Sequence, residues 1–532
     1  MPSTPVTITA AELHLLREAA RERDALLSAF TRVNGELRVK TVECDLLLER
    51  LKAFQRKLFA STSEARGCEQ TDLFLNEAEA IAPTDATFPA KEDGDDEIEV
   101  SGHKRKKRGG RKPLDPALPR VVVRHELPEV ERVCPHDGSV LVEIGVEVSE
   151  QLDIIPQQVR VIQHQRVKYA CLRCDQGIRR TPAPARIIPK GLFTEAALAW
   201  IIVSKYVDGL PLYRLAALLR RFGGDISRNT LAASVVRVGI AVQPIINLLR
   251  DCLLSSEIIH GDETTLQVLK EAGRTAQTRS YLWAQMNASG PPIRLFTYAP
   301  GRGGAQAVKL YAGVRPGAAL MTDGYEPYNA IAQTHGLMHL GCWAHARRYF
   351  IEAEDALPKN ARKPDQLATR FIGLIGKLYR AEARAKGWTA PRRQRLRASY
   401  STAVLREMEQ LLLANLHALA PASLLGKALH YLSRQWPKLT RFIENGAWPV
   451  DNNPCENAIR PFVVGRRNWL FADTVGGATA SANLYSIVET CKANGIDPYQ
   501  YLVALFRELP LARTADDYEN LLPWKMGLPV RS

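Results

Sequence analysis

Apolar residues recur every seven positions along the first sixty residues of the chain. A period of about 3.5 residues keeps one apolar seam facing a partner helix, so the pattern predicts a coiled-coil dimerisation helix over residues 10–60. Asn34 falls in the seam, where a polar side chain fixes the register and the number of strands. The alternative is an amphipathic helix that packs against its own protein. The two columns of the repeat are Leu13, Ala20, Leu27 and Leu48, and Leu16, Phe30, Leu37, Cys44, Leu51 and Leu58.

Periodicity is lost over residues 61–117, where an acidic run is followed by a basic run. Blocks of like charge repel one another and remain solvated, so we predict a disordered linker here. The basic run either binds DNA phosphates without sequence preference or is a solvated stretch that its acidic neighbour neutralises. Its first cations are Lys104, Arg105, Lys106, Lys107 and Arg108, and it extends to Lys112.

β-Branched residues are frequent in three short runs, at 121–126, 146–155 and 159–169, which predicts strands. The turns between them carry cysteines, a histidine and an aspartate, and thiolate and imidazole are ligands that Zn²⁺ prefers. We predict a zinc-ribbon-like β module over residues 118–185, with a metal-free β hairpin as the alternative. The candidate zinc ligands are Cys134, His136, Asp137, Cys171 and Cys174.

The pattern changes to a helical period over residues 190–252. Helices are predicted at 194–206, 211–222 and 227–238, with a Gly-Gly turn between the last two. This arrangement favours a helix-turn-helix DNA-binding region, in which the start of the third helix contacts bases or phosphates. An ordinary helical hairpin is the alternative. The side chains placed for such contacts are Arg228 and Asn229.

From residue 253 the pattern gives three strands followed by alternating helices and strands. Residues 343–447 have a helical period, and a further helix is predicted within 448–484. We therefore predict a multidomain α/β protein with an RNase H-like catalytic core, built on a mixed five-stranded sheet with helices. This core comprises residues 253–342 and 448–484 and is interrupted by an α-helical insertion at 343–447. Residues 485–532 are predicted to form a C-terminal tail.

Three carboxylates occur at particular points of this core. Asp262 lies within the first predicted strand, Asp323 follows the fourth strand, and Glu456 lies in the first turn of the final helix. The successive acids are 61 and 133 residues apart, so only tertiary folding can bring them together. Each acid alone would be a surface carboxylate or a helix cap. Three in this order favour a triad that binds hard divalent cations, Mg²⁺ or Mn²⁺.

Several side chains near the acids are candidates for further roles. Glu263 alternates to the opposite face of its strand and is not expected to be a metal ligand. His345 either orients a water or the scissile phosphate, or is structural. Arg460 lies four residues after the third acid, where it contacts a DNA phosphate or pairs with that acid. Arg466 and Arg467 extend this basic face.

Composition favours a polyanionic partner. The chain of 532 residues has 71 Lys and Arg against 57 Asp and Glu, a formal net charge of +14. A basic surface attracts nucleic acids or anionic membranes. The longest apolar stretch, residues 196–203, is too short to cross a bilayer, so we expect no membrane partner. Nine scattered cysteines and a polar N-terminal segment predict a cytoplasmic protein.

Four motifs together resemble those of the DDE transposases of the insertion sequence 66 family. The resemblance covers nearly the whole chain, and Asp137 stands where the family has its second zinc cysteine. It implies that Asp262, Asp323 and Glu456 are the catalytic triad and that two Mg²⁺ or Mn²⁺ ions bind there. The motifs are His260-Gly-Asp-Glu-Thr264, Thr322-Asp-Gly-Tyr325, Gly341-Cys-Trp-Ala-His-Ala-Arg347 and Asn452-Asn-Pro-Cys-Glu-Asn-Ala-Ile-Arg460.

The resemblance implies a bacterial enzyme that cuts double-stranded DNA at the terminal inverted repeats of a mobile element and joins the 3′ ends to target DNA. A homodimer or higher oligomer would pair the two element ends, with or without helper proteins, at the nucleoid. A tyrosine or serine recombinase needs a covalent nucleophile in an arginine-rich site, and no such cluster stands out. A DNA-binding regulator would not need the triad. An RNase H-like nuclease shares the cleavage chemistry, and only strand joining distinguishes it from a transposase.

Overall fold

The computed structural model describes residues 9–59, 158–166, 168–170, 178–180, 183–357 and 363–529. The predicted linker with its basic run and the five candidate zinc ligands lie outside these residues. Contacts along the chain separate Ser61–Arg160 from one compact unit, which comprises Met1–Ala60 and Val161–Ser532. The elements described below belong to that unit.

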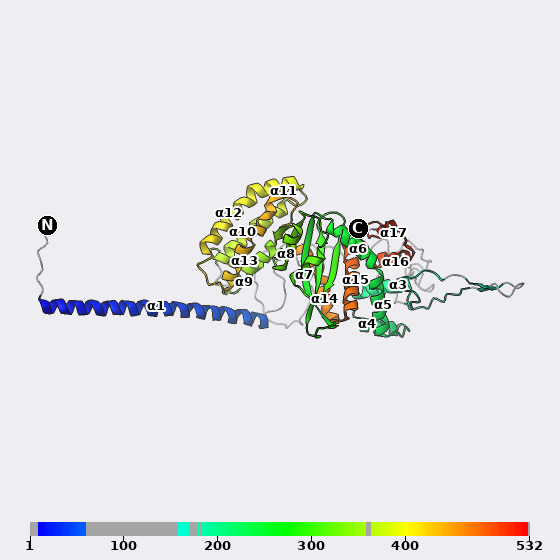
Figure 1. Ribbon diagram of the computed structural model, residues 1–532, viewed down its shortest axis with the longest axis horizontal. Helices are drawn as coiled ribbons and strands as arrows, with labels where there is room; N and C mark the ends of the chain where they lie inside the picture. Colours follow the sequence, from blue (N-terminus) through cyan, green and yellow to red (C-terminus); the bar gives the residue numbers. More distant parts are fainter. Residues whose placement is uncertain are drawn as a thin grey trace, which may run out of the picture. The chain divides into compact units, whose positions relative to one another are not determined.

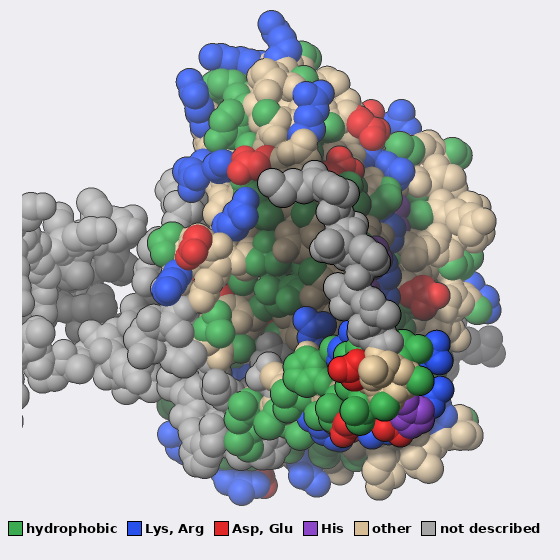
Figure 2. All heavy atoms as spheres, turned by 90° about the vertical axis from the view of Figure 1, so that its left-hand side faces the viewer, with side chains coloured by type: hydrophobic (Ala, Val, Ile, Leu, Met, Phe, Trp, Pro, Cys, Tyr) green, Lys and Arg blue, Asp and Glu red, His purple; other side chains and the backbone are tan. Residues whose placement is uncertain are grey.

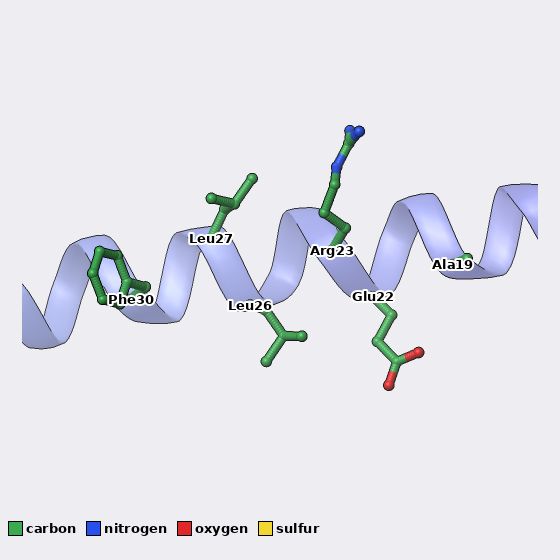
Figure 3. Close-up of a pocket in the computed structure, with 6 residues that line it drawn as sticks. All are labelled: Ala19, Glu22, Arg23, Leu26, Leu27 and Phe30. Carbon is green, nitrogen blue, oxygen red and sulfur yellow. The ribbon is translucent and has the colours of Figure 1, made fainter.

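The predicted coiled-coil segment is one continuous helix, α1 (Ala10–Phe59). Thr9 and Glu12 cap its start reciprocally: Glu12 accepts from the Thr9 N–H at 2.8 Å, and the Thr9 hydroxyl accepts from the Glu12 N–H at 3.3 Å. Figure 3 shows Leu26, Leu27 and Phe30 projecting from the helix, and the Phe30 side chain is 68% exposed. The predicted helix is confirmed, and its apolar residues are available for a partner.

Only part of the predicted zinc-ribbon-like module is described. It consists of an irregular stretch at 158–166 and two short antiparallel strands, β1 (Lys168–Ala170) and β2 (Ile178–Arg180). The strand expected over 159–169 is therefore wrong for most of its length. Residues 158–166 are exposed, so their β-branched side chains lack the packing against a sheet that stabilises such strands.

A helical region follows, and it confirms the three predicted helices and adds a fourth. Ser227 caps the third by accepting from the Thr230 N–H at 3.1 Å. No single described helix is long and apolar enough to span a membrane. Among the described helices, only Arg228–Ala241 and Gln243–Leu254 taken together have the length and apolar character of a span, and this pair is bent by 48° at its junction. The helices are α3 (Glu195–Tyr206), α4 (Leu212–Arg221), α5 (Arg228–Ala241) and α6 (Gln243–Leu254).

A mixed sheet carries the first two acids (Figure 1). Its first three strands pair antiparallel and the next two run parallel to the first, which gives the order β5-β4-β3-β6-β7. A short strand that the sequence did not predict, β8 (Ala472–Thr474), pairs with the far end of β3. The five predicted strands are confirmed as β3 (Ile258–Lys270), β4 (Arg279–Asn287), β5 (Arg294–Ala299), β6 (Ala319–Thr322) and β7 (Met338–Gly341).

Helices pack against both faces of the sheet. Ile259 of β3 is buried on the face that packs against α7 (Gly304–Leu310) and α8 (Pro327–His335). Leu266 is buried on the face that packs against α14 (Asn453–Trp469) and α15 (Val475–Ala493). Because side chains alternate along a strand, the neighbouring residues Asp262 and Glu263 of β3 point to opposite faces of the sheet.

Residues 343–447 form the predicted helical insertion. They have a hydrophobic core of their own, with Phe371, Leu378 and Leu432 fully buried. The elements are α9 (Trp343–Asp355), α10 (Leu367–Arg384), α11 (Ala390–Leu396), a π-helical turn (Arg397–Ser401), α12 (Thr402–Asn415), α13 (Leu424–Leu439) and a 3₁₀ turn (Arg441–Glu444).

The residues of the predicted C-terminal tail are mostly helical up to residue 520. α15 continues through residue 484, where the boundary was expected, and α16 (Pro498–Glu508) and α17 (Ala515–Asn520) follow. Their apolar side chains share one cluster with α3 to α6 and α14. At Gly239 of α5 an added Cβ would lie 2.4 Å from the Ala480 Cβ of α15, so small residues allow these helices to approach closely. Helical region, core and C-terminus are therefore packed together.

Candidate active site

The parallel pairing of β3 and β6 brings the first two acids together. Along these strands His260 lies opposite Met321, an offset of 61 residues. Asp262 on β3 and Asp323, the residue directly after β6, have the same offset, so each lies two residues beyond that pair. Adjacent strands are about 4.8 Å apart. The two carboxylates therefore lie at one edge of the sheet.

Glu456 reaches this edge from the first turn of α14. The residue before the helix, Asn452, is fully buried and joins three elements. Its amide donates to the Gly261 carbonyl at 3.0 Å, and its Oδ1 lies 2.9 Å from Nδ1 of His260, both on β3. Its backbone N–H donates to Sγ of Cys342, after β7, at 3.2 Å. These bonds fix the start of α14 against the strand that carries the first acid.

The carboxylates influence one another electrostatically. Burial raises the pKa of Asp262 well above its ordinary value, and the charges of Asp323, Glu263 and Glu456 raise it further. The Glu263 N–H, which donates to Asp262 at 2.8 Å, lowers the pKa of Asp262 and offsets part of this rise. The Tyr325 N–H donates to the Asp323 carboxylate at 2.9 Å. A bound cation would relieve the remaining repulsion.

Two side chains of α9 flank Glu456. Arg348 donates to its Oε2 at 3.1 Å, and Nδ1 of His345 lies 3.4 Å from its Oε1. The second pair is not aligned as a hydrogen bond, and both atoms are buried without a hydrogen-bond partner among the described residues. Burial lowers the pKa of His345 although Glu456 opposes this. Arg460, one turn further along α14, is half-buried.

Cys342, His345 and Glu456 place a sulfur, a nitrogen and an oxygen within 4.8 Å of one another. Such a set could suit a soft metal ion, but the ligand form of cysteine is the thiolate. Burial raises the pKa of Cys342 to about 12, and its sulfur already accepts the N–H of Asn452. Cys342 therefore acts as a neutral packing residue and hydrogen-bond acceptor.

Glu263 points to the face opposite the acids, as strand alternation predicts. Its carboxylate accepts from the Tyr328 hydroxyl at 2.8 Å and lies 3.2 Å from the Arg302 guanidinium. Burial, with a contribution from Asp323, raises the pKa of Glu263 to about 6. Arg302 also stacks on Tyr325, 3.6 Å from the ring centre. Glu263 therefore anchors an arginine against the tyrosine that follows Asp323.

The helical insertion supports the loop that carries Asp323. From α13, the Tyr431 hydroxyl donates to the Asp323 carbonyl at 2.7 Å, and the Gln435 amide donates to the Gly324 carbonyl at 3.2 Å. Gly324 has a φ of +91°, and a Cβ there would lie 2.9 Å from the Gln435 side chain. The insertion is therefore in direct contact with the active site.

The other predicted DNA-binding residues lie in different surroundings. Arg228 and Asn229 are exposed in the first turn of α5. Arg467 is exposed near the end of α14. Arg466 instead donates to the carbonyl and hydroxyl of Thr265 on β3, so it fastens α14 to the sheet and does not extend the exposed basic face.

The residues that support the acids were hard to predict from local patterns. An asparagine just before a helix is typical of a cap, but the Asn452 side chain makes no cap hydrogen bond and instead donates to the Gly261 carbonyl of β3. Arg348 lies one helical turn after His345, and this spacing alone predicts that the two side chains are neighbours on one helix face. Arg302 lies in a glycine-rich loop, and Tyr431 lies more than a hundred residues from Asp323, so neither had a local signal.

Four family models match the chain. Residues 190–480, more than half of its length, match the Transposase IS66 family. Residues 486–524 match the IS66 C-terminal element, and residues 131–175 match the zinc-finger binding domain of transposase IS66. Residues 46–123 match a model described as Transposase C of IS166 homeodomain.

Proteins of Sinorhizobium fredii are similar over most of their length. The uncharacterized protein y4qI is 33% identical over 411 residues, which are 75% of this chain and 74% of that protein. The uncharacterized protein y4jD is 31% identical over 423 residues, 76% of this chain and 81% of that protein. The uncharacterized protein y4hP is 31% identical over 509 residues, which are 91% of this chain and 88% of that protein. With these likenesses and with family models matched from residue 46 to residue 524, the chain belongs to the IS66 family of transposases.

Proposed function

We propose that this protein is a DDE transposase with an RNase H-like core and that Asp262, Asp323 and Glu456 are its catalytic residues. The main observation behind the proposal is the β3–β6 register, which brings Asp262 and Asp323 side by side at one edge of the sheet. Glu456, in the first turn of α14, reaches the same edge. The strand order, a three-stranded antiparallel meander extended by two parallel strands, supports the RNase H-like assignment. Family membership supports the transposase role.

The donor set fits divalent cations. Asp262, Asp323 and Glu456 offer carboxylate oxygens, the ligands that Mg²⁺ and Mn²⁺ prefer. One of these oxygens, Oε1 of Glu456, is buried without a hydrogen-bond partner among the described residues. We propose that the three acids hold two such ions. Bound there, the ions would lower the pKa of a water and offset charge on the attacking and leaving oxygens.

The proposed reaction is in-line phosphoryl transfer in two stages. Water first attacks a phosphodiester at the end of the element, and the bond to the 3′ oxygen breaks, which frees a 3′-hydroxyl. That hydroxyl then attacks a phosphodiester of the target, joins to its phosphorus and releases a target 3′-hydroxyl. Arg348 keeps the Glu456 carboxylate in place, and its side chain is 53% exposed, within reach of a DNA phosphate.

Double-stranded DNA is the proposed partner, both as terminal inverted repeats and as target. The zinc-finger match at 131–175 supports zinc bound by the cysteines, histidine and aspartate predicted there. The exposed seam of α1 supports a homodimer or higher oligomer that pairs two ends. The proposed DNA contacts are the 104–112 basic run, Arg228, Asn229, Arg460 and Arg467.

The test uses labelled terminal-repeat DNA, a target plasmid and Mg²⁺. We expect strand-transfer products from the wild type. Asp262→Asn, Asp323→Asn and Glu456→Gln should each lower cleavage by roughly a hundredfold or more while DNA binding persists, because each removes a ligand charge. Asp473→Asn is the matched control, since Asp473 is an exposed acid that pairs with Lys270 on the same sheet.

Each other result has a definite meaning. Cleavage without joined products would indicate an RNase H-like nuclease. Specific binding without Mg²⁺-dependent cleavage would indicate a DNA-binding regulator. Near wild-type cleavage by any one triad variant would remove that residue from the site.

A further inference from the structure

The helical insertion carries a strongly basic segment. From residue 377 to residue 397 there are eight Lys and Arg and one acid, Glu382. That acid is already neutralised, because the buried Arg397 donates to both of its carboxylate oxygens at 2.7 and 2.8 Å. Lys377 pairs with Glu407 on α12 at 3.2 Å. The remaining cations have no acidic partner among the described residues.

Five of these cations form what we call the cationic face. All five are exposed, and none makes an ion pair within the part of the chain that the structure describes. Figure 2 shows Lys and Arg side chains predominating at the top of the view, where Figure 1 places α11 and α12. The cationic face consists of Arg380, Arg384, Lys386, Arg392 and Arg395.

Contacts on the other side of α11 fix the orientation of this face. Arg393 donates to the Gly446 carbonyl at 3.1 Å, and Gln394 donates to the Glu444 carbonyl at 2.6 Å. An added Cβ at Gly446 would lie 1.8 Å from the Ala390 carbonyl oxygen, so the helix is held tightly there. The neighbouring cations on α11 are thereby directed away from the insertion core.

The cationic face is electrostatically unfavourable by itself. Arg380 and Arg384 lie four residues apart on α10, where like charges repel. The guanidinium of Arg392 lies 4.0 Å from the ring centre of Trp388, which restricts its motion. Glu444 contacts α11 through its backbone carbonyl, and among the described residues it forms no ion pair with these cations. A polyanion that replaced their counterions would gain affinity through counterion release.

We propose that the cationic face binds the phosphate backbone of double-stranded DNA without reading its sequence. This inference rests on the proposed function, which makes DNA the substrate, and it assigns a DNA surface to the insertion. The same insertion holds the Asp323 loop through Tyr431 and Gln435. DNA bound on the cationic face is therefore held by the module that also supports a catalytic acid.

The first test measures DNA binding by the full-length Asp262→Asn protein, which leaves the DNA uncut. Into it we introduce Arg384→Gln, Lys386→Gln, Arg392→Gln and Arg395→Gln together. Affinity should fall at least about tenfold at ~0.15 M salt, equally for terminal-repeat and random DNA. The slope of log affinity against log salt should flatten by about 0.9 for each phosphate that the protein no longer binds, or about 3 to 4 for four phosphates.

Two matched variants accompany this one. Replacing Arg384, Arg392 and Arg395 by Lys keeps the charge and should keep most of the affinity. Neutralising four exposed cations elsewhere removes the same net charge and should have a much smaller effect. An equal loss in this second variant, or an unchanged salt slope in the first, would overturn the proposal. The four control positions are Arg279, Lys309, Arg507 and Arg513.

A second measurement needs no change to the cationic face. Acetylation of Lys386, followed by mass spectrometry, should slow several-fold when saturating DNA is bound, whereas the exposed Lys309 should react at an unchanged rate. Unchanged reactivity of Lys386 would overturn the proposal even if the fourfold variant did not fold. A failure of the proposed function would look different, because the wild type would then bind DNA but not cut it with Mg²⁺.

Discussion

Asn452 connects β3, the end of β7 and the start of α14 through one buried amide and one backbone N–H. It does not belong to the carboxylate triad, so its contribution is to position Glu456 relative to Asp262. A residue in this role affects both the stability of the core and the binding of the cations that the triad is proposed to hold. The two effects can be separated by experiment.

Asn452→Ala should lower the free energy of unfolding by about 2–4 kcal/mol, because the Gly261 carbonyl and the His260 ring each lose a buried partner. It should also raise the Mg²⁺ concentration needed for half-maximal cleavage. Urea unfolding and a metal titration of activity measure the two effects. Asn457→Ala, at an exposed position on the same helix, should leave both near wild type. If Asn452→Ala lowers stability but leaves the Mg²⁺ requirement unchanged, Asn452 has a structural role only.

Asp262 predicts a pH dependence of stability in the absence of metal ions. Its folded-state pKa is raised, first by burial and then by neighbouring acids, so the folded protein holds this proton more tightly than the unfolded chain. Its contribution to stability is therefore present at low pH and is lost as the pH rises from the ordinary carboxyl range towards the raised value. Unfolding in EDTA at several pH values should show this loss.

Asp262→Asn supplies the control for that experiment. The amide has no charge to desolvate, so its stability advantage over the wild type should grow as the pH rises. Added Mg²⁺ should stabilise the wild type at neutral pH, because an ion that binds only the folded state shifts the equilibrium, and should stabilise the variant less. Parallel stability curves for the two proteins in EDTA would contradict the raised pKa.

Among the elements, β3 to β7 could be predicted from two signals. Each strand contains β-branched or aliphatic residues that are buried, and glycine or proline occurs in the turns between strands. The same patterns placed the first acid within one strand and the second directly after another, but the pairing of these two strands came only from the structure. α15 could not be predicted, because it is buried on nearly all sides and has no amphipathic stripe to mark it. The supports of Asp323 were missed because they come from α13, through contacts that leave no local signal.

Tyr431 tests whether the insertion supports catalysis. Tyr431→Phe removes the donor to the Asp323 carbonyl, so stability should fall by about 0.5–1.5 kcal/mol. The Asp323 loop should also bind metal more weakly, which would raise the Mg²⁺ requirement of cleavage. Tyr400→Phe is the matched control, because Tyr400 is 43% exposed and lies in the π-helical turn. Equal metal titrations for the two variants would argue against a role for α13 in the active site.

At the scale of the whole molecule, α1 is the element through which we propose that copies of the chain associate. Leu27→Asp and Leu37→Asp place charges in the predicted seam and should dissociate the oligomer, because a buried carboxylate there has no partner. Val39→Asp is the control, since Val39 is 58% exposed and lies outside the seam. Sedimentation equilibrium measures the mass of each protein. A monomeric wild type, or equal masses for all variants, would favour a helix without a coiled-coil partner.

The order of the acids along the chain determines when a newly made protein has the complete triad that we propose to cut DNA. Asp262 and Asp323 pair through strands close in sequence, whereas Glu456 follows the whole helical insertion. Closing the longer segment costs more entropy, which favours docking of α14 after the pairing of β3 with β6. A chain still on the ribosome carries only two of the three acids until α14 has been synthesised. If the proposed function holds, the host genome is not exposed to a complete carboxylate triad until α14 has been made.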